Sequence, residues 1–501
     1  MKPEGPLWLS EGGRAPTEIA QEYMAGQDII LDQQFIKHDL NTLEAHMLML
    51  NKVGLISGSV LAKTLGSLEK IRVLDAKGEY KLQKELEDVH SNIESTVIKD
   101  VGIENGGWLR LGVARNDQIY TDTRMYMREH VNVVITELLK LIDTLLELAD
   151  GNLETVMPGY THLRISQPIT LAHWLTAKVS HLFDDIERLE FTFGQINDSP
   201  LGIVEMAGTH LTIDRQYEAD LLGFDGVLEN SLYASNSRGE VEAVLLCDLS
   251  LLMLHCRRMV QELILWSSYE FGFIELDDGY TTGGTAQPNL RNPDALEMVR
   301  AKAPKVYSKL NQVIAIMDIL PSGYNRDTQE TKSCVFEAVD IVEKTIPVLR
   351  GVVSTMKLNK ERMRSLSGRN FATAPDVTTQ LAFKSGIDFR SCYLVVKKLI
   401  RGGYLKESFA ELTPELLSKV SRETIGKEVK VKKKDLEEVL DPVECALSHD
   451  SLGGPAPKEV ARMIKEQRKK VREHINFLEA RAKKLNSADE KLAALVVATL
   501  E

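Results

Sequence analysis

Hydrophobic residues recur at helical spacing along most of the chain. In the segment NVVITELLKLIDTLLELAD, residues 132–150, they occupy every third or fourth position from Val134 to Leu148, as on one face of a helix. Further apolar residues between these positions widen the stripe around the helix. A helix that is apolar on so many sides is typical of the interior of a bundle or of an oligomer.

Four other long segments show the same periodicity, and they cover residues 169–193, 240–271, 293–320 and 331–356. Each exceeds the ~11–12 residues of an average helix, and the alternation typical of strands is scarce. After Lys357 the helical stretches become shorter, until a basic amphipathic stretch runs from Pro457 to Lys484. We therefore predict an all-α protein with three parts: an N-terminal helical region (residues 1–112), a central bundle of long helices (113–357) and a smaller C-terminal helical region (358–501).

The composition is that of an ordinary globular protein and argues against a nucleic-acid surface. The 501-residue chain has 43% hydrophobic and 27% charged residues and a net charge of −12. Nucleic-acid binding needs a clustered basic surface. The two basic runs, Lys430–Lys434 and Arg468–Arg472, are flanked by acidic residues and are typical of solvated faces. We expect no nucleic-acid partner.

The cysteines and the hydrophobic runs indicate a cytoplasmic protein without a cofactor. Five scattered cysteines suit a reducing compartment without disulfides, and no pair has the spacing of a zinc site. The N-terminus lacks the apolar core of a signal peptide, and no run approaches the ~20 apolar residues of a membrane span. GGWLRLGV contains glycines without the GxGxxG spacing of a dinucleotide site. We expect no metal, no cofactor and no membrane contact.

Five polar segments stand near the starts of long helices. They are EDVHSNIES (87–95), GVARNDQIYTDTR (112–124), MPGYTHLRISQP (157–168), ASNSRGE (234–240) and the loop that opens YTTGGTAQPNLRNPDALEMVR (280–300). Unpaired N–H groups at helix starts suit anions, and Arg115, Arg238 and Arg291 add fork-shaped carboxylate donors. Each segment alone is also explained as a cap and turn. Together, with a histidine in two of them, they indicate a site for a small polycarboxylate.

The same segments make the chain resemble argininosuccinate lyase, within the superfamily of fumarase, aspartase and adenylosuccinate lyase. The resemblance rests on EDVHSNIE, GVARNDQIYTDTRMYMR, MPGYTHLRISQPITLAHW, YTTGGTAQPNLRNPDALE, LPSGYNRDTQETK and LDPVECALSHDSLGG. It follows the family's order from about Asp39 to Gly454, so nearly the whole chain is covered. GYTH together with RNDQ is highly specific.

The resemblance implies an all-α fold of the fumarase/aspartase type and a carbon–nitrogen lyase of arginine biosynthesis. Members of that family are homotetramers with one large central bundle, and each active site is assembled from three chains. In the family reaction a base removes the β-proton of a succinyl group, a carboxylate stabilises the carbanion, and the departing nitrogen is protonated as fumarate leaves. Fixed dipoles and cations must support that carbanion. On this basis we expect sister subunits to cover the apolar stripe of residues 132–150.

The resemblance also implies roles for individual residues. His162 would assist proton transfer, paired with Glu297 on the helix that follows the polar loop. Seven positions match residues that bind substrate in the family: Arg115, Asn116, Thr161, Asn292, Tyr324, Gln329 and Lys332. The last three of these match positions that grip the arginine half of argininosuccinate, whereas Arg115 and Asn116 would hold substrate carboxylate.

The loop departs from the family pattern, which is usually Gly-Ser-Ser-x-Met-Pro-x-Lys-x-Asn and here reads GGTAQPNLRN. The family's catalytic serine falls on Gly284, the second serine on Thr285, and the supporting lysine on Leu290. Ala114 and Leu43 replace two further hydroxyl residues on the fumarate side. Because a missing general base typically costs ~10²–10⁴-fold in rate, Thr285 is a candidate catalytic residue in place of the serine.

Three functions remain open from the sequence. The first is a lyase acting on argininosuccinate or a related N-substituted succinate, with Thr285, His162 or Tyr160 as a rearranged base. The second is a lyase for a different substrate, and the losses at Ala114 and Leu43 would suit a substrate that lacks one carboxylate. The third is a non-catalytic member with a structural or regulatory role, which co-assembles with an active paralogue.

Overall fold

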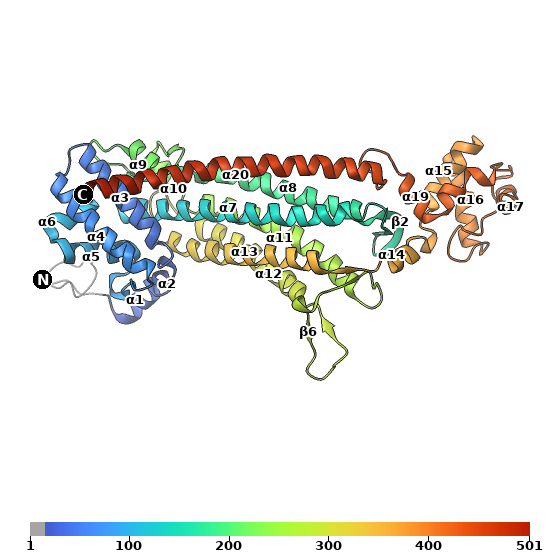
Figure 1. Ribbon diagram of the computed structural model, residues 1–501, viewed down its shortest axis with the longest axis horizontal. Helices are drawn as coiled ribbons and strands as arrows, with labels where there is room; N and C mark the ends of the chain where they lie inside the picture. The colour runs from blue at the N-terminus through green and yellow to red at the C-terminus, as the bar shows by residue number, and fades with distance from the viewer. Residues whose placement is uncertain (1–15) are drawn as a thin grey trace.

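The computed structural model describes residues 16–501 and is an elongated helical bundle with a smaller helical unit at one end (Figure 1). Residues 1–15, which hold most of the N-terminal segment considered above for a signal peptide, lie outside the described residues. The prediction of an all-α fold is confirmed, since strands in the described residues occur only as four two-stranded pairs.

Long helices form the bundle: α7 (Arg115–Asp150), α8 (Leu171–Ile196), α11 (Glu240–Ser267), α12 (Asp294–Met317), α13 (Thr331–Thr355) and α20 (Pro457–Leu500). Helix α7 packs along α8, α13 and α20, while α11 packs along α12 and α8. The four long segments predicted from periodicity correspond to α8, α11, α12 and α13 within a few residues. The fifth segment, residues 132–150, covers only the second half of α7. The first half of this helix buries many polar side chains, so its sequence shows no periodic apolar stripe.

Shorter helices surround the end of the bundle at which α7 begins (Figure 1). They are α1 (Glu18–Ala25), α2 (Asp28–Asp32), α3 (Ile36–Lys52), α4 (Gly58–Ala76), α5 (Val89–Val101), α6 (Ile103–Gly106), α9 (Arg215–Leu221) and α10 (Ser231–Asn236). Helix α20 reaches the same end and packs on α3, α4 and α9. None of the helices in the described part of the chain is long and apolar enough to cross a membrane.

The opposite end carries a unit with its own hydrophobic core, which runs from Val377 to Val439. Its helices are α15 (Ala374–Ser385), α16 (Phe389–Arg401), α17 (Pro414–Ile425), α18 (Glu437–Leu440) and α19 (Pro442–Ser448). Helix α14 (Lys360–Ser367) precedes the unit, and its Met363 joins the main core. Helix α20 leaves this unit and returns along the bundle, where Val460, Ile464 and Val496 join the main core. The predicted C-terminal region, residues 358–501, therefore contains two parts. The boundary lies before α20, because the apolar face of that helix packs against the bundle.

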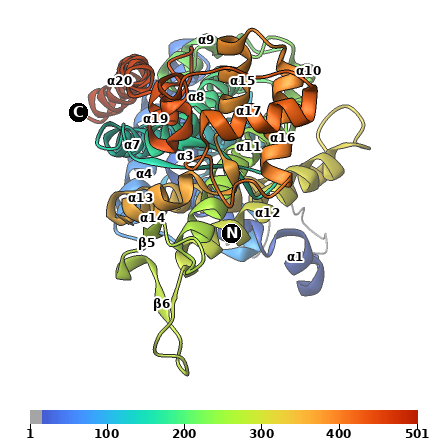
Figure 2. The ribbon, with the colours of Figure 1, turned by 90° about the vertical axis from the view of Figure 1, so that its right-hand side faces the viewer.

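Two hairpins project from the long helices. Strands β1 (Val156–Thr161) and β2 (Arg164–Thr170) pair antiparallel beyond the end of α7, and β6 (Thr282–Gly283) pairs with β7 (Arg291–Asn292) between α11 and α12. The second hairpin extends away from the bundle (Figure 2). The remaining pairs are β3 (Asp198–Ser199) with β4 (Gly226–Val227), and β5 (Ile274–Glu275) with β8 (Lys357–Leu358).

Pairing in the second hairpin also corrects the predicted start of α12. Asn292, one of the predicted substrate-binding residues, is the last residue of β7 and pairs with Thr282. Pro293 occupies the cap position and the helix begins at Asp294. The Thr282 hydroxyl donates to the Asp294 carboxylate, which ties the hairpin to the first turn of the helix.

The chain itself covers most of the apolar surface of α7. Leu138, Leu141 and Leu145 are fully buried. Among the further apolar residues that widen the stripe of residues 132–150, only Val133 is substantially exposed, at 40%. The expectation that sister subunits cover this helix is therefore wrong for nearly all of it, because α8, α13 and α20 already do so.

Helix α11 carries the apolar stripe that the single chain leaves facing outward. Val244, Cys247 and Leu254 are exposed and Leu251 is half-buried. These residues follow one another at steps of three and four, so they lie on one face of the helix. An outward apolar face on a long bundle helix is typical of a surface that packs against another copy.

We predict a tetramer that uses this face of α11. Light scattering should give a particle of four times the 56.1 kDa chain mass. Leu254→Glu should shift the particle toward smaller species, because it places a charge in a desolvated contact. Lys469→Glu on the exposed side of α20 should leave the mass unchanged. A wild-type monomer would contradict the prediction.

Candidate active site

A polar cavity of about 140 Å³ lies where the start of α7 meets α2, α5 and the segment before α13. Charged and hydrogen-bonding side chains from all these elements line it: Asp28, Asp32, Asp88, His90, Arg115, Asn116, Arg238, Tyr324, Arg326, Gln329 and Lys332. Five of the seven substrate-binding residues predicted from the sequence are in this set. The cavity therefore brings together residues that lie as far as 300 positions apart in the chain.

Asp117 fixes the start of α7 and with it Arg115 and Asn116. Its carboxylate accepts from the backbone N–H of Ala114 at 2.9 Å, Gly202 at 3.0 Å and Val204 at 2.8 Å. Complete burial raises the pKa of this carboxyl to about 7, against the opposing effect of those N–H groups. The Asp117 side chain thus anchors the first turn of α7 to the loop after β3.

Carboxylates of the chain itself contact the two side chains predicted to hold substrate carboxylate. The Arg115 guanidinium lies 2.8 Å from Asp88 and 3.6 Å from Glu87, and the Asn116 amide donates to Glu205. Asp88 also caps α5 through the Ser91 N–H at 2.7 Å. A substrate carboxylate would therefore have to exchange with these partners.

Lys332 forms a buried ion cluster with α2. Its ammonium contacts Asp28 and lies 2.6 Å from Asp32, and the side chain is only 2% exposed. Burial alone would lower the pKa of this lysine, but the two carboxylates outweigh it and raise the pKa. Burial raises the pKa of Asp28 to about 6 in spite of Lys332. Lys332 is thus already paired with two carboxylates of the chain. Its contact with substrate remains a prediction.

Arg238 is a buried cation of the cavity for which the described residues provide no ion-pair partner. It is 6% exposed, and its Nη1 atom has no hydrogen-bond partner among the described residues. Its guanidinium lies over the Tyr324 ring, 5.6 Å from the centroid. The ASNSRGE segment indicated Arg238 only as one of three carboxylate donors, and its burial could not be predicted without the fold. A buried guanidinium with an unmet donor is well suited to an anionic ligand group.

A second buried cluster lies behind the cavity and contains His90. Its Nδ1 atom is 2.8 Å from Asp39 Oδ1, and Asp122 accepts from the Thr42 hydroxyl at 2.8 Å. Burial and the neighbouring Asp39 carboxylate raise the pKa of Asp122 well above its usual range. His90 is therefore held through Nδ1, while its Nε2 atom has no hydrogen-bond partner among the described residues and the side chain also lines the cavity.

The turn between β1 and β2 carries the predicted proton-transfer residue. His162 and Leu163 form a two-residue loop between the paired residues Thr161 and Arg164, and both have left-handed backbone angles, with φ of 54° and 57°. Such a loop normally contains Asn-Gly, and each residue costs about 1–3 kcal/mol in this conformation. The strained turn presents Thr161 and His162 to solvent, outside the cavity.

The β6–β7 hairpin carries Thr285 on an exposed loop. Arg291 stands at its base, where it contacts Glu275 at 2.7 Å and the Leu276 carbonyl at 2.8 Å. These contacts hold Arg291 at the base of the hairpin. Arg291 therefore does not replace the lysine that the family pattern has at the position of Leu290. Thr285 is the hydroxyl residue nearest to the position of the family's serine.

The predicted catalytic pair does not meet within one chain. Glu297 lies in the first turn of α12, with its carboxylate 3.0 Å from Arg300. No described contact joins it to His162. Helix α7 has 36 residues and is about 54 Å long, and it separates the cavity from the β1–β2 turn. Cavity, turn and loop can therefore form one site only by contributions from several copies.

Known proteins resemble this chain in sequence and in fold. The family profile described as Lyase matches residues 18–308. Argininosuccinate lyase from Bacillus cereus is 37% identical over 94% of this chain and 99% of its own length. The crystal structure of EDDS lyase in complex with formate superposes with a TM-score of 0.85 at 24% identity, over 97% of this chain and 96% of that chain. Class II fumarase from Schistosoma mansoni superposes with a TM-score of 0.70 at 14% identity, over 88% and 99% of the two chains. These two structures share the fold.

The Lys332 cluster gives a stability prediction. Lys332→Met should lower the free energy of unfolding by about 3–5 kcal/mol, because two buried carboxylates lose their counterion. Thermal melting measures the loss. Lys344→Met is the matched control on the same helix, since its exposed pair with Asp340 contributes about 0.5 kcal/mol or less.

A second variant separates charge from packing in that cluster. Asp28→Asn combined with Lys332→Met should recover part of the lost stability, because one uncompensated carboxylate is removed. Equal melting temperatures for Lys332→Met and wild type would show that the buried cluster does not stabilise the fold.

Proposed function

We propose, since the chain belongs to the argininosuccinate lyase family, that it eliminates fumarate from argininosuccinate or a related N-substituted succinate. Membership makes the chain a carbon–nitrogen lyase, and the substrate is the part that is proposed. The observation that carries the proposal is the cavity at the start of α7, where Arg115, Asn116, Tyr324 and Gln329 meet beside Arg238, whose Nη1 atom has no hydrogen-bond partner among residues 16–501. This donor set suits a substrate with carboxylates.

Arg238 and Tyr324 would receive the amino-acid half of the substrate. The Nη1 donor of Arg238 is buried and unmet, so a substrate carboxylate would satisfy it without displacing a protein partner. Arg115, whose side chain is 40% exposed, would exchange its contact with Asp88 for a carboxylate of the succinyl half. Two cations at different depths of the cavity would thus orient the two halves.

The reaction would proceed by removal of a β-proton from the succinyl group, then cleavage of the C–N bond with protonation of the nitrogen. The electron pair of the broken C–H bond becomes the double bond of fumarate, and the nitrogen leaves with the pair of the C–N bond. His162 with Glu297, and Thr285, are the proposed proton-transfer groups. They lie on the β1–β2 turn, on α12 and on the β6–β7 loop, so other copies of the chain would bring them to the cavity.

The loop would accept the residues of the family pattern. A Cβ atom at Gly284 would lie 3.2 Å from the Gln287 carbonyl oxygen, which a shift of a few tenths of an ångström relieves. Gly284 is not in the left-handed region, so a serine there is not strained. Leu290 is 37% exposed and offers room for a lysine. Low activity of the wild type would thus follow from chemistry rather than from loop geometry.

A related substrate is favoured by one observation. Lys332 is surrounded by two carboxylates, Asp28 and Asp32, so this part of the cavity carries a net negative charge when both are ionised. If the half of the substrate that leaves with the nitrogen ends in an ammonium group, it suits this negatively charged side of the cavity better than a half that ends in a carboxylate. An N-(aminoalkyl)succinate is therefore the second candidate, and a comparison of kcat/KM with argininosuccinate decides between them.

Restoring the loop should increase activity. Gly284→Ser combined with Leu290→Lys should raise the rate of fumarate release from argininosuccinate by at least about 10²-fold, because it returns a base and its cation. Each change alone should do less, since the two groups act together. Fumarate absorbance measures the rate, and Gly283→Ser, one residue away in open space, is the matched control.

One outcome would contradict the prediction for the Gly284→Ser and Leu290→Lys double variant. A wild type that already turns over at ~1–10³ per second, with a slower double variant, would mean that Thr285 or another group is a competent base in this loop.

Arg238 should control substrate binding. Arg238→Gln should raise KM about 10–100-fold with little change in kcat, because a charge-assisted hydrogen bond contributes about 1.5–3 kcal/mol. Arg350→Gln on α13, 3.8 Å from Glu137, is the control and should behave as wild type. An unchanged KM with a lowered melting temperature would assign Arg238 a structural role only.

A further inference from the structure

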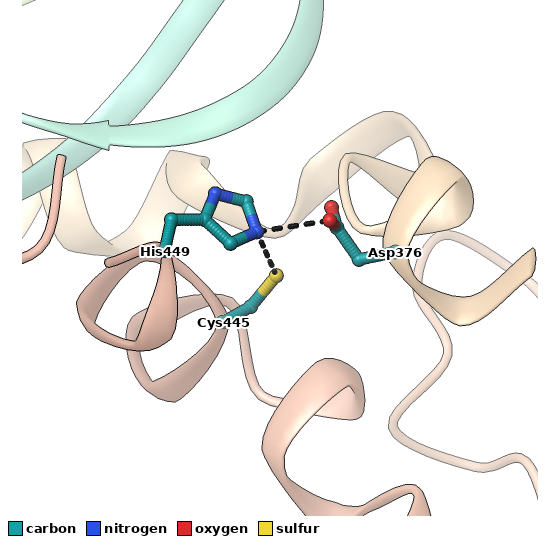
Figure 3. A group of neighbouring side chains, drawn as sticks. All are labelled: Asp376, Cys445 and His449. Carbon is teal, nitrogen blue, oxygen red and sulfur yellow. Dashed lines mark hydrogen bonds and ion pairs between the residues drawn. The ribbon is translucent and has the colours of Figure 1, made fainter. Parts of the chain in front are cut away.

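Three side chains with metal-ligating atoms meet between the C-terminal unit and the end of the bundle (Figure 3). His449 Nε2 lies 2.9 Å from Asp376 Oδ1 and 3.8 Å from Cys445 Sγ. All three ligand atoms lie within 4.8 Å of one another. None of these residues belongs to the cavity, to either hairpin or to the proposed proton-transfer groups.

The local fold positions the three side chains. Asp376 lies in the first turn of α15. Cys445 lies in α19, and His449 follows the last residue of that helix, so the two side chains are one turn apart. Asp441 caps α19 by accepting from the Val443 N–H at 2.7 Å. The donors therefore stand on two helices, and the start of α19 is fixed by its cap.

We propose that Asp376, Cys445 and His449 bind a divalent transition-metal ion of the zinc class. One sulfur, one imidazole nitrogen and one carboxylate oxygen are a donor set that Zn²⁺ accepts, and a hard ion such as Mg²⁺ would not prefer the thiolate. Three protein ligands leave the fourth tetrahedral position for water or an added donor.

The distances suit an ion placed among the three atoms. With metal–sulfur bonds of ~2.3 Å and metal–nitrogen or metal–oxygen bonds of ~2.0–2.1 Å, tetrahedral ligands lie about 3.3–3.6 Å apart. The sulfur-to-nitrogen distance of 3.8 Å is close to this range. The nitrogen-to-oxygen distance of 2.9 Å would have to widen by about 0.4 Å. Small rotations of partly exposed His449 and Asp376 supply that change.

Binding would change the protonation of the cluster in a defined way. The Cys445 thiol would release its proton to solvent as the sulfur–metal bond forms, and His449 would ligate as neutral imidazole with its proton on Nδ1. Without a metal, burial and the Asp376 carboxylate raise the pKa of the Cys445 thiol well above its usual range. A free thiol in that state is a poor nucleophile, so a covalent catalytic role is not favoured.

The ion would join α15 to α19, and a hydrogen bond links this cluster to the hairpin that carries His162. Gln167 of β2 donates to Asp376 Oδ2 at 3.3 Å, so the ligand that α15 supplies is already oriented by the hairpin. Such outer hydrogen bonds commonly fix metal-bound carboxylates. Asp376 and His449 are 73 positions apart, which is why the spacing of cysteines in the sequence indicated no zinc site.

Cobalt substitution tests the proposal on the full-length protein. Chelator-treated protein titrated with Co²⁺ should develop a thiolate-to-cobalt charge-transfer band that saturates at one ion per chain and disappears when Zn²⁺ is added. Cys445→Ser and His449→Gln should each abolish the band. Cys392→Ser is the matched control, since Cys392 is a buried cysteine of the same unit whose thiol donates to the Ile387 carbonyl.

Thermal melting gives a second measurement that does not depend on the cobalt absorption band. Zn²⁺ should raise the melting temperature of wild type and of Cys392→Ser, and should leave those of Cys445→Ser and Asp376→Asn unchanged. The absence of a charge-transfer band, or a band and a thermal shift that persist in Cys445→Ser, would show adventitious binding and a merely hydrogen-bonded cluster.

Discussion

The length of α7 is the constraint on which the rest of the structure depends. Its 36 residues place Arg115 and the β1–β2 turn about 54 Å apart. One chain therefore holds the proposed substrate cavity at one end and His162 at the other, with the β6–β7 loop projecting between them (Figures 1 and 2). Only further copies of the chain can bring these parts together. The outward apolar face of α11 supplies a surface on which such copies would pack.

Buried charge shapes the cavity at the start of this helix. Asp117 anchors the first turn, while Lys332 joins α2 to α13 through Asp28 and Asp32. These ion pairs hold the walls in place before any ligand arrives, and preorganised donors are what a reaction with a developing carbanion requires. Arg238 differs from Lys332 because it is buried without an ion pair in the part of the chain that the structure describes. Two residues that line the cavity, Arg238 and His90, each have a buried nitrogen without a hydrogen-bond partner among the described residues.

Local patterns in the sequence predicted the long helices and five of the residues that line the cavity, because helical period and motif order are local properties. They did not predict the pairing of Lys332 with Asp32, which joins residues 300 positions apart. They also placed α20 with the C-terminal region, since an amphipathic period shows that a helix has a buried face but not which neighbour covers it. The Asp376–Cys445–His449 cluster was missed for the same reason: its residues meet only in the tertiary fold.

Sharing of the site between chains is the central claim, and mixing two defective variants tests it most directly. Arg238→Gln removes a buried donor of the cavity, and His162→Asn removes the proposed proton-transfer residue of the turn. If the sites are shared, hybrid tetramers formed by dissociating and reassembling the two variants together should regain a measurable part of the wild-type rate of fumarate release, because some sites then contain neither substitution. If hybrid tetramers form and their rate is no higher than that of either variant alone, each chain must contain a complete site, and the account is contradicted.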